Sequence, residues 1–408
     1  MTWSLEPGYR RETLPDPETV GEDAELVAAL RDDIAKTGPI TSARFMDRAL
    51  YEPGHGYYRQ TAPGPGMAGD FLTAPEAHPV YGAALARLVD EAWAAMGRPT
   101  PFTITEQGAG TGALAAGLLG GLRDAGSPLA AGVRYRPVEV EPARLVALAA
   151  RLRAEGFDHA LAADEPPSDA VETGVVIANE VLDALPVHRV VGRPGGLREL
   201  LVAVGADGGF TWQEAEPTTP ALAARLDAEG VVLADGQITE VCLALDDWLA
   251  AATRHLARGI VVLVDYAAEP ADLHGAARPE GTLRVFARHA VGGDPFRHIG
   301  RQDLTATVDL AAVRAGAAAA GLALVGETTQ AELLVAAAGP AADGQTGLTD
   351  PWLRGPDATL ESALHLRSAL ARLMDTRGMG GFRVLVFGRG LPTDLRLPLL
   401  HRMRPPRA

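Results

Sequence analysis

The chain has 408 residues, 47% of them hydrophobic, and a formal net charge of −15. This length and apolar content allow a substantial folded core. The negative charge repels phosphate backbones, which argues against nucleic acid as a partner. The single cysteine, Cys242, excludes an intrachain disulfide and a thiolate zinc cage, because each needs at least two cysteines.

The N-terminal region is polar, and the apolar stretches further along the chain are short. Residues 1–23 lack the apolar segment of a secretory signal. No stretch approaches the ~20 apolar residues of a membrane-spanning helix. We therefore expect a cytoplasmic protein without a membrane partner, and formation of a homodimer is left open.

The N-terminal segment predicts two short helices and a long loop. Residues 22–37 form the first helix, because Leu26, Ala29, Leu30 and Ile34 fall on one face. Residues 42–50 form the second. The stretch 53–69 is rich in glycine and proline and predicts no regular structure. A loop of this length is more often functional than idle.

The middle of the chain alternates between predicted strands and helices. The strands are apolar without polar alternation, as in a parallel sheet that helices cover on both faces. This pattern predicts an α/β fold with a doubly wound, mostly parallel, Rossmann-like sheet. The expected strands are 102–106, 134–140, 175–178 and 260–264, and the expected helices are 112–123, 145–154 and 238–256.

Two segments interrupt this alternation. Residues 187–217 contain short β-like runs broken by glycine and proline, which predicts an inserted hairpin, and residues 269–300 form a second insertion. The chain then returns to a helix over 309–320 and strands over 322–325 and 382–387. The expected division is an N-terminal helical arm with an active-site loop (1–100), core (101–186), insertion (187–236), core (237–268), insertion (269–308) and the C-terminal part of the core (309–408).

A glycine-rich loop follows the first predicted strand. That strand ends at Glu106 and leads through Gly108, Gly110 and Gly112 into a helix, an arrangement that brings bare backbone against a nucleotide. The spacing resembles the first motif of S-adenosylmethionine (SAM) methyltransferases, whose acidic residue helps to fix the methionine end of the cofactor. Gly108, Gly110 and Ala113 also fit the dinucleotide-binding motif G-x-G-x-x-A loosely, so an NAD oxidoreductase stays an alternative.

A carboxylate at the end of the next predicted strand supports a nucleoside ligand. Glu139 stands where it can accept hydrogen bonds from ribose hydroxyls, either of SAM or of NAD. Two alternatives stay open. Glu139 is a solvated charge at the strand end, or Glu141 takes its place.

Polar residues follow the predicted strand 175–178 directly. Asn179 and Glu180 stand at its carboxyl end, where an open α/β sheet binds its ligands. In a helical turn, Glu180 and Asp183 would share one face and hold a cationic nitrogen. The alternative is structural, with Asn179 as a helix cap and Asp183 satisfying a backbone donor.

Several segments together resemble the MidA-like methyltransferases, the family of the mitochondrial complex I assembly arginine methyltransferase. Residues 178–186 (ANEVLDALP) are the most distinctive piece, similar to the family's A-N-E-x-x-D-A-L-P. Shorter matches stand in the family's order over most of residues 41–390. They include 51–58, 69–76, 106–114, 138–140, 240–241, 264–266, 281–283, 303–309, 329–330 and 379–380.

The resemblance implies a class I fold, a SAM cofactor and, for some relatives, symmetric dimethylation of a protein arginine. It implies that Asp70 and Thr73 close over the methionine end of SAM, and it makes Glu240 a candidate at the substrate nitrogen. Glu240 is alternatively a charge that complements a helix dipole. The chain departs from the family by lacking an aromatic residue in 161–164, by having Val181 and Leu182 after Asn-Glu, and by having Ala267 after Asp-Tyr.

We therefore predict a SAM-dependent methyltransferase that modifies nitrogen, with an arginine guanidinium of a protein or peptide as the expected acceptor. Two alternatives are a small-molecule or natural-product methyltransferase of the same fold, and a SAM-binding assembly factor with little catalysis. His274, His289 and His298 lack the spacing of a zinc site, so no metal is expected. The candidate catalytic residues are Asn179, Glu180, Asp183 and Glu240, and the candidate cofactor residues are Glu106, Gly108, Gly110, Gly112, Glu139, Asp70, Thr73 and Asn179.

Overall fold

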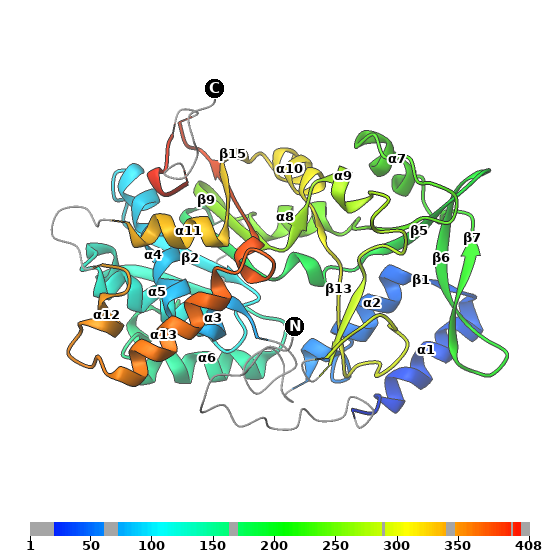
Figure 1. Cartoon of the computed structure of the whole chain (residues 1–408), viewed down its shortest axis with the longest axis horizontal. Helices are drawn as coiled ribbons and strands as arrows, with labels where there is room; N and C mark the ends of the chain where they lie inside the picture. Colours follow the sequence, from blue (N-terminus) through cyan, green and yellow to red (C-terminus); the bar gives the residue numbers. More distant parts are fainter. Residues whose placement is uncertain are drawn as a thin grey trace.

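The computed structural model describes residues 20–60, 72–162, 170–287, 290–339, 347–392 and 395–400. Two sheets dominate it. A six-stranded sheet with its covering helices lies beside a five-stranded sheet that packs with the first two helices of the chain (Figure 1).

The six-stranded sheet confirms the predicted α/β fold. Its order is β15-β16-β9-β4-β2-β3, where β2, β3, β4 and β9 run parallel and β16 is antiparallel to both neighbours. The chain builds β3 on one side of β2 and then β4 and β9 on the other, so the winding reverses between β2 and β4. Ligands bind at such a switch point, outside the carboxyl ends of the strands. The strands are β2 (Phe102–Gln107), β3 (Val133–Val138), β4 (Glu172–Asn179), β9 (Leu256–Asp265), β15 (Ala323–Thr329) and β16 (Arg383–Arg389).

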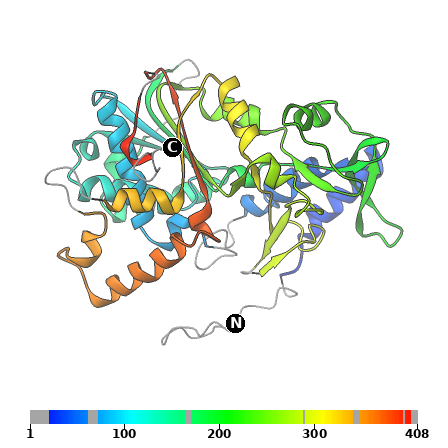
Figure 2. The same ribbon diagram turned by 45° about the horizontal axis from the view of Figure 1, so that its top comes forward.

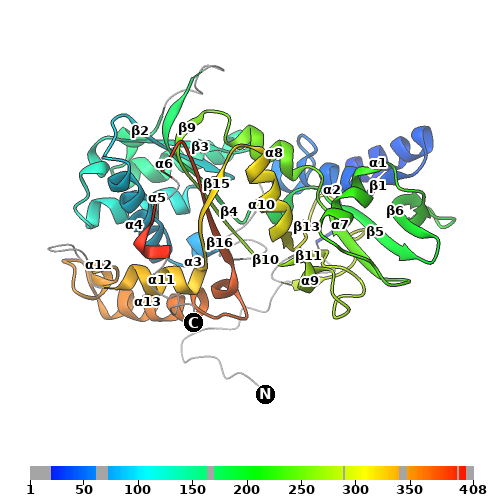
Figure 3. The same cartoon turned by 90° about the horizontal axis from the view of Figure 1, so that it is seen from above.

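Helices cover both faces of this sheet (Figure 3). Alternate residues of β4 face opposite layers: Ile177 packs in the core formed with α4, α5, α6, α11 and α13, whereas Val176 packs in the core formed with α8 and α10. This explains why the strands are apolar throughout. The helices are α4 (Val80–Ala95), α5 (Ala113–Asp124), α6 (Pro142–Ala154), α8 (Leu245–Ala252), α10 (Leu310–Ala319), α11 (Gln330–Ala338), α12 (Asp350–Leu353) and α13 (Leu360–Leu373).

The second sheet contains the hairpin of β5 and β6 within the predicted insertion, and three further strands. Its order is β1-β6-β5-β8, with β7 paired to β6, and all its pairs are antiparallel. The helix α7 (Ala221–Ala228) follows β7. The strands are β1 (Ile40–Thr41), β5 (His188–Arg193), β6 (Gly196–Val204), β7 (Phe210–Ala215) and β8 (Ile238–Val241).

The predicted helix over 238–256 is wrong. Ile238–Val241 forms β8, only Leu245–Ala252 is helical, and Leu256 already begins β9. Ile, Thr and Val are β-branched and fit a sheet well, and β5 offers β8 a pairing partner far away in sequence. The helical spacing of apolar residues carried no information about this partner.

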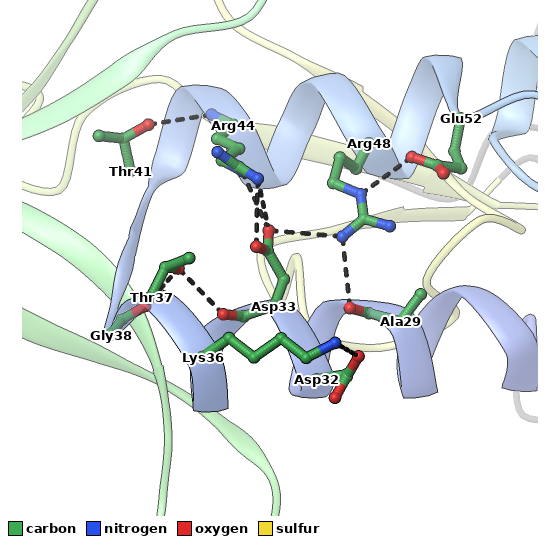
Figure 4. A network of polar contacts seen from close by, with 10 residues as sticks. All are labelled: Ala29, Asp32, Asp33, Lys36, Thr37, Gly38, Thr41, Arg44, Arg48 and Glu52. Carbon is green, nitrogen blue, oxygen red and sulfur yellow. Dashed lines mark hydrogen bonds and ion pairs between the residues drawn. The ribbon is translucent and has the colours of Figure 1, made fainter.

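The first two helices form close to their predicted positions. α1 (Ala24–Thr37) and α2 (Ser42–Tyr51) are joined by ion pairs between Asp33 and both Arg44 and Arg48 (Figure 4). Arg48 also donates to Glu52 at 2.9 Å. Such pairs near the surface contribute little singly, so the buried apolar side chains hold the helices. Leu26, Leu30 and Ile34 are buried as expected. Ala29, which was expected on the same face, is exposed, and Val27 is buried instead.

Short elements complete the fold. A small sheet of β11 (Arg284–Ala287), β12 (Ala290–Gly292) and β13 (Asp303–Thr305) packs through Val285 and Leu304 against α1 and α2 (Figure 2). β10 (Ala267–Ala268) pairs with β14 (Val308–Asp309), α3 is Ala74–Ala77, and α9 is Pro270–Leu273. Within the described ranges, no helix is both long and apolar enough to cross a membrane.

Candidate active site

The glycine loop joins β2 to α5 at the switch point of the sheet. Gly108, Gly110 and Gly112 all have positive φ, at 67°, 52° and 84°, a region that glycine adopts without strain. A Cβ on Gly108 would lie 2.8 Å from Val181, and one on Gly112 would lie 2.7 Å from Leu148. A Cβ on Gly110 would meet no atom within 4 Å. Gly108 and Gly112 thus allow close packing, whereas Gly110 faces open space that a ligand can fill.

Glu139 lies beside this loop, as its place after β3 predicts. Its Oε2 accepts a hydrogen bond of 2.9 Å from the Gly110 N–H, and its Oε1 accepts from the N–H groups of Val140 and Glu141 at 2.8 and 3.2 Å. The carboxylate therefore fixes the glycine loop to the end of β3. Glu141 instead accepts from the Ala143 N–H and caps α6.

Glu106 is buried at the end of β2. Its Oε2 accepts a hydrogen bond of 2.6 Å from the Tyr135 hydroxyl on the neighbouring strand. Burial raises the pKa of Glu106 to about 8, even though this hydrogen bond favours the ionised form. A positive charge beside Glu106 would stabilise its ionised form and lower this pKa.

Asn179 and Glu180 stand at the end of β4, next to the glycine loop. Glu180 Oε1 accepts hydrogen bonds of 3.0 Å from the Ala74 N–H and from Asn179 Nδ2, and the Tyr81 hydroxyl donates to Asn179 Oδ1. Thr73 immediately precedes Ala74 and thus lies near Glu180, whereas Asp70 falls outside the described residues. Glu180 has a positive φ of 53°. A residue other than glycine rarely adopts this backbone conformation, and such residues cluster at functional sites.

Two further carboxyl groups accompany Glu180. Asp265, at the end of β9, accepts through Oδ2 from the N–H groups of Val181, Leu182 and Asp183 at 3.2, 2.9 and 3.3 Å. Asp183 is buried on the turn that these bonds hold. We call Glu180, Asp183 and Asp265 the acidic cluster. None of the three forms an ion pair with an arginine, lysine or histidine anywhere in the described part of the chain.

The environment favours the protonated form of each member of the acidic cluster. Burial raises the pKa of Glu180 to about 7. Burial and the nearby Glu180 raise the pKa of Asp265 to about 7 as well. Burial, with the negative charges of Asp265 and Asp303, holds the pKa of Asp183 well above its usual range. These groups lack the positive charge that would stabilise their ionised forms.

Aromatic side chains lie beside the acidic cluster. Tyr51 and Tyr58 stack with their ring centroids 5.6 Å apart, and the Tyr51 hydroxyl donates to the Ala184 carbonyl at 3.0 Å. The Tyr266 hydroxyl lies 2.7 Å from Thr305 Oγ1. These tyrosines and Asp265 are not among the residues predicted for the site. Asp265 could have been found, because it ends an apolar strand as Asn179 does.

Glu240 lies apart from this arrangement, in β8 of the second sheet. Its Oε1 accepts from Arg189 Nε at 3.0 Å, and its Oε2 accepts from the N–H and hydroxyl of Thr282 at 2.6 and 2.9 Å. The alternative role at a helix start is wrong, because Glu240 belongs to a strand. We therefore leave Glu240 out of the acidic cluster.

The raised pKa values predict that stability falls as pH rises. Glu106, with a pKa of about 8, and Glu180, with a pKa of about 7, titrate near 4.5 when unfolded. The folded chain thus binds more protons than the unfolded chain between these values. The free energy of unfolding should fall over this window by up to about 1.4 kcal/mol per pH unit for each group.

Urea denaturation at pH 5, 6, 7 and 8 measures this slope. Glu180→Gln should make it shallower, because the variant lacks one of the titrating groups. A free energy of unfolding that is constant or rises across this range would contradict the proposed protonation states.

Comparisons with known proteins agree with this geometry. Residues 84–328 match the family described as "Putative S-adenosyl-L-methionine-dependent methyltransferase". A superfamily member from Burkholderia thailandensis, crystallised with S-adenosyl-homocysteine, is 33% identical with a TM-score of 0.80, over 95% of this chain and 97% of that chain. The native crystal structure of a protein from the same organism is 32% identical with a TM-score of 0.78.

Named relatives are protein arginine methyltransferases. The mitochondrial NDUFAF7 homolog of Drosophila melanogaster is 28% identical over 71% of this chain and 69% of its own length. The human mitochondrial NDUFAF7 is 31% identical over 42% of this chain and 43% of its own length. Because these relatives carry mitochondrial names, the prediction of a cytoplasmic protein is contradicted.

The glycine loop, the carboxylate after β3 and the open space at Gly110 fit a nucleoside cofactor. The family match covers more than half of the chain, and the structural likeness covers nearly all of it. The chain therefore belongs to this family of S-adenosylmethionine-dependent methyltransferases, with S-adenosylmethionine as its cofactor.

Proposed function

We propose that this methyltransferase modifies a guanidinium nitrogen of arginine in a protein or peptide. The observation that carries the proposal is the acidic cluster. Its three carboxyl groups stand at the same edge of the sheet as the glycine loop, and Val181, beside Glu180, packs on Gly108. The names of the relatives as protein arginine methyltransferases support the same acceptor.

A guanidinium suits the acidic cluster electrostatically and geometrically. Its charge would favour ionisation of Glu180, Asp183 and Asp265, whose pKa values burial and mutual repulsion raise. Its planar set of N–H donors matches the oxygens of carboxylates. The hydrogen bonds that Glu180 accepts within the described chain use Oε1, which leaves Oε2 for an acceptor molecule.

The bound cofactor supplies an electrophilic methyl group on its sulfonium. The acidic cluster holds the guanidinium and orients one nitrogen lone pair, so positioning and electrostatics carry most of the rate. In the transfer, the N–CH₃ bond would form as the S–CH₃ bond breaks, and the methylated nitrogen would lose one proton. Glu180, ionised beside the guanidinium, is the group we assign to accept it.

The cofactor residues in this proposal surround the glycine loop. The open space at Gly110 would receive the cofactor, Glu106 at the end of β2 would face its methionine end, and Glu139, which accepts from the Gly110 N–H, would bind the ribose. Gly108 and Gly112 shape the loop. Thr73 and Asn179, linked through Ala74 and Glu180, border the methionine end.

The test uses SAM with a labelled methyl group. The purified chain is incubated with this SAM and a protein extract, and the proteins are then hydrolysed for amino-acid analysis. We expect label in methylated arginine, and the ratio of mono- to dimethylarginine gives the number of transfers. Label only in small molecules would overturn the proposal and favour the small-molecule alternative. Absence of transfer despite SAM binding would favour an assembly factor.

A further inference from the structure

Three potential metal ligands from separate segments meet outside the acidic cluster. Glu229 follows α7, His274 follows α9, and Asp309 precedes α10. One ligand atom from each lies within 4.8 Å of the other two. The cluster thus brings the segment after α7, next to the second sheet, together with the start of the core helix α10.

The distances between these atoms suit one bound ion. His274 Nε2 lies 3.6 Å from Glu229 Oε2 and 3.4 Å from Asp309 Oδ2. Ligands about 2.1 Å from a tetrahedral ion stand about 3.4 Å from one another. The residues therefore require little rearrangement to coordinate an ion between them.

The surroundings orient two of the three ligands. His274 Nδ1 lies 2.6 Å from Thr239 Oγ1, which fixes the ring and directs Nε2 toward the carboxylates. Metal-binding histidines are usually held through their second nitrogen in this way. Asp309 Oδ1 accepts from the N–H groups of Ala311 and Ala312 at the start of α10, so Oδ2 stays available.

Glu229 supplies a second, independent indication of a cation-binding site. Its side chain is only 6% exposed, and neither of its buried oxygens has a hydrogen-bond partner in the described chain. Burying such a group without a donor is costly.

A small cavity adjoins the three side chains. Its volume is about 30 Å³, and its lining includes Glu229, His274 and Asp309 together with Cys242 and Thr307. This is about the space that one water molecule takes up. A bound ion would therefore have room for a water as its fourth ligand.

We propose that Glu229, His274 and Asp309 bind a divalent transition-metal ion of the zinc type. One imidazole and two carboxylates suit such an ion. The bound ion would connect the segment after α7, beside the second sheet, to the start of α10. The prediction of no metal rested on the single cysteine and on histidine spacing. That spacing could not reveal a site whose ligands come from three distant segments.

Calorimetric titration of the chelator-treated full chain with ZnCl₂ tests the proposal. We expect one Zn²⁺ per chain and a higher melting temperature with Zn²⁺ than with EDTA. Glu229→Gln removes a ligand charge without changing size, and it should weaken Zn²⁺ binding at least about tenfold. Thr239→Val releases the His274 ring and should weaken it about 10–100-fold. His159→Gln, at an exposed histidine outside the cluster, should leave it unchanged.

Circular dichroism and SAM binding show whether each variant is folded. Absence of Zn²⁺ binding to the wild-type chain would overturn the proposal. So would Zn²⁺ affinity that folded Glu229→Gln retains in full, or that His159→Gln reduces as much as Glu229→Gln does. Because the wild-type titration needs no variant, a folding defect cannot obscure the result, and because it needs no methyl acceptor, it is independent of arginine methylation.

Discussion

Glu180→Gln should lower kcat for methyl transfer by about 100- to 1000-fold, the usual cost of removing one preorganised electrostatic group from a reacting centre. The substitution keeps the size of the side chain and an oxygen for the Ala74 N–H. It removes the charge that holds the guanidinium and the group that accepts its proton. Steady-state kinetics with an arginine peptide measure kcat, and calorimetry should show nearly unchanged SAM affinity.

Glu155→Gln is the matched control, because Glu155 is exposed after α6 and lies outside the acidic cluster. Its kcat should equal that of the wild-type chain. A fully active Glu180→Gln enzyme would contradict the role of the acidic cluster, as would an equal loss in both variants.

Gly110→Ala should weaken SAM binding at least about tenfold. The added methyl group enters the open space beside the loop, and alanine resists the left-handed backbone at a cost of about 1 kcal/mol. Calorimetric titration with SAM measures the affinity, and urea denaturation measures the effect on stability separately.

Gly156→Ala separates backbone strain from loss of the cofactor site. Gly156 also has positive φ, at 79°, with no atom within 4 Å of an added Cβ, but it lies in the turn after α6. Both variants should lose similar stability, and only Gly110→Ala should lose SAM affinity. Equal SAM affinities in the two variants would contradict the assignment of Gly110 to the cofactor site.

Local features of the sequence predicted much of the fold and part of the site. Apolar strands marked the parallel sheet, and Glu106, Gly108 and Asn179 were identifiable because each stands where a strand ends. In the structure, Glu139 accepts from the Gly110 N–H, and its contact with the ribose stays a prediction.

Features that depend on distant partners were not predictable in this way. Asp265 holds the N–H groups of Val181 to Asp183, more than 80 residues earlier in the chain. β8 was taken for a helix because its pairing with β5 is invisible in the local pattern. The cluster of Glu229, His274 and Asp309 was not predicted for the same reason, because its members are far apart in sequence.

A crystal structure of the chain with S-adenosyl-homocysteine and an arginine peptide tests the central claim most directly. We expect the nucleoside against Gly110 and the guanidinium within hydrogen-bonding distance of Glu180, with its nitrogen directed at the cofactor sulfur. A guanidinium bound elsewhere while Glu180, Asp183 and Asp265 contact only solvent would contradict the account.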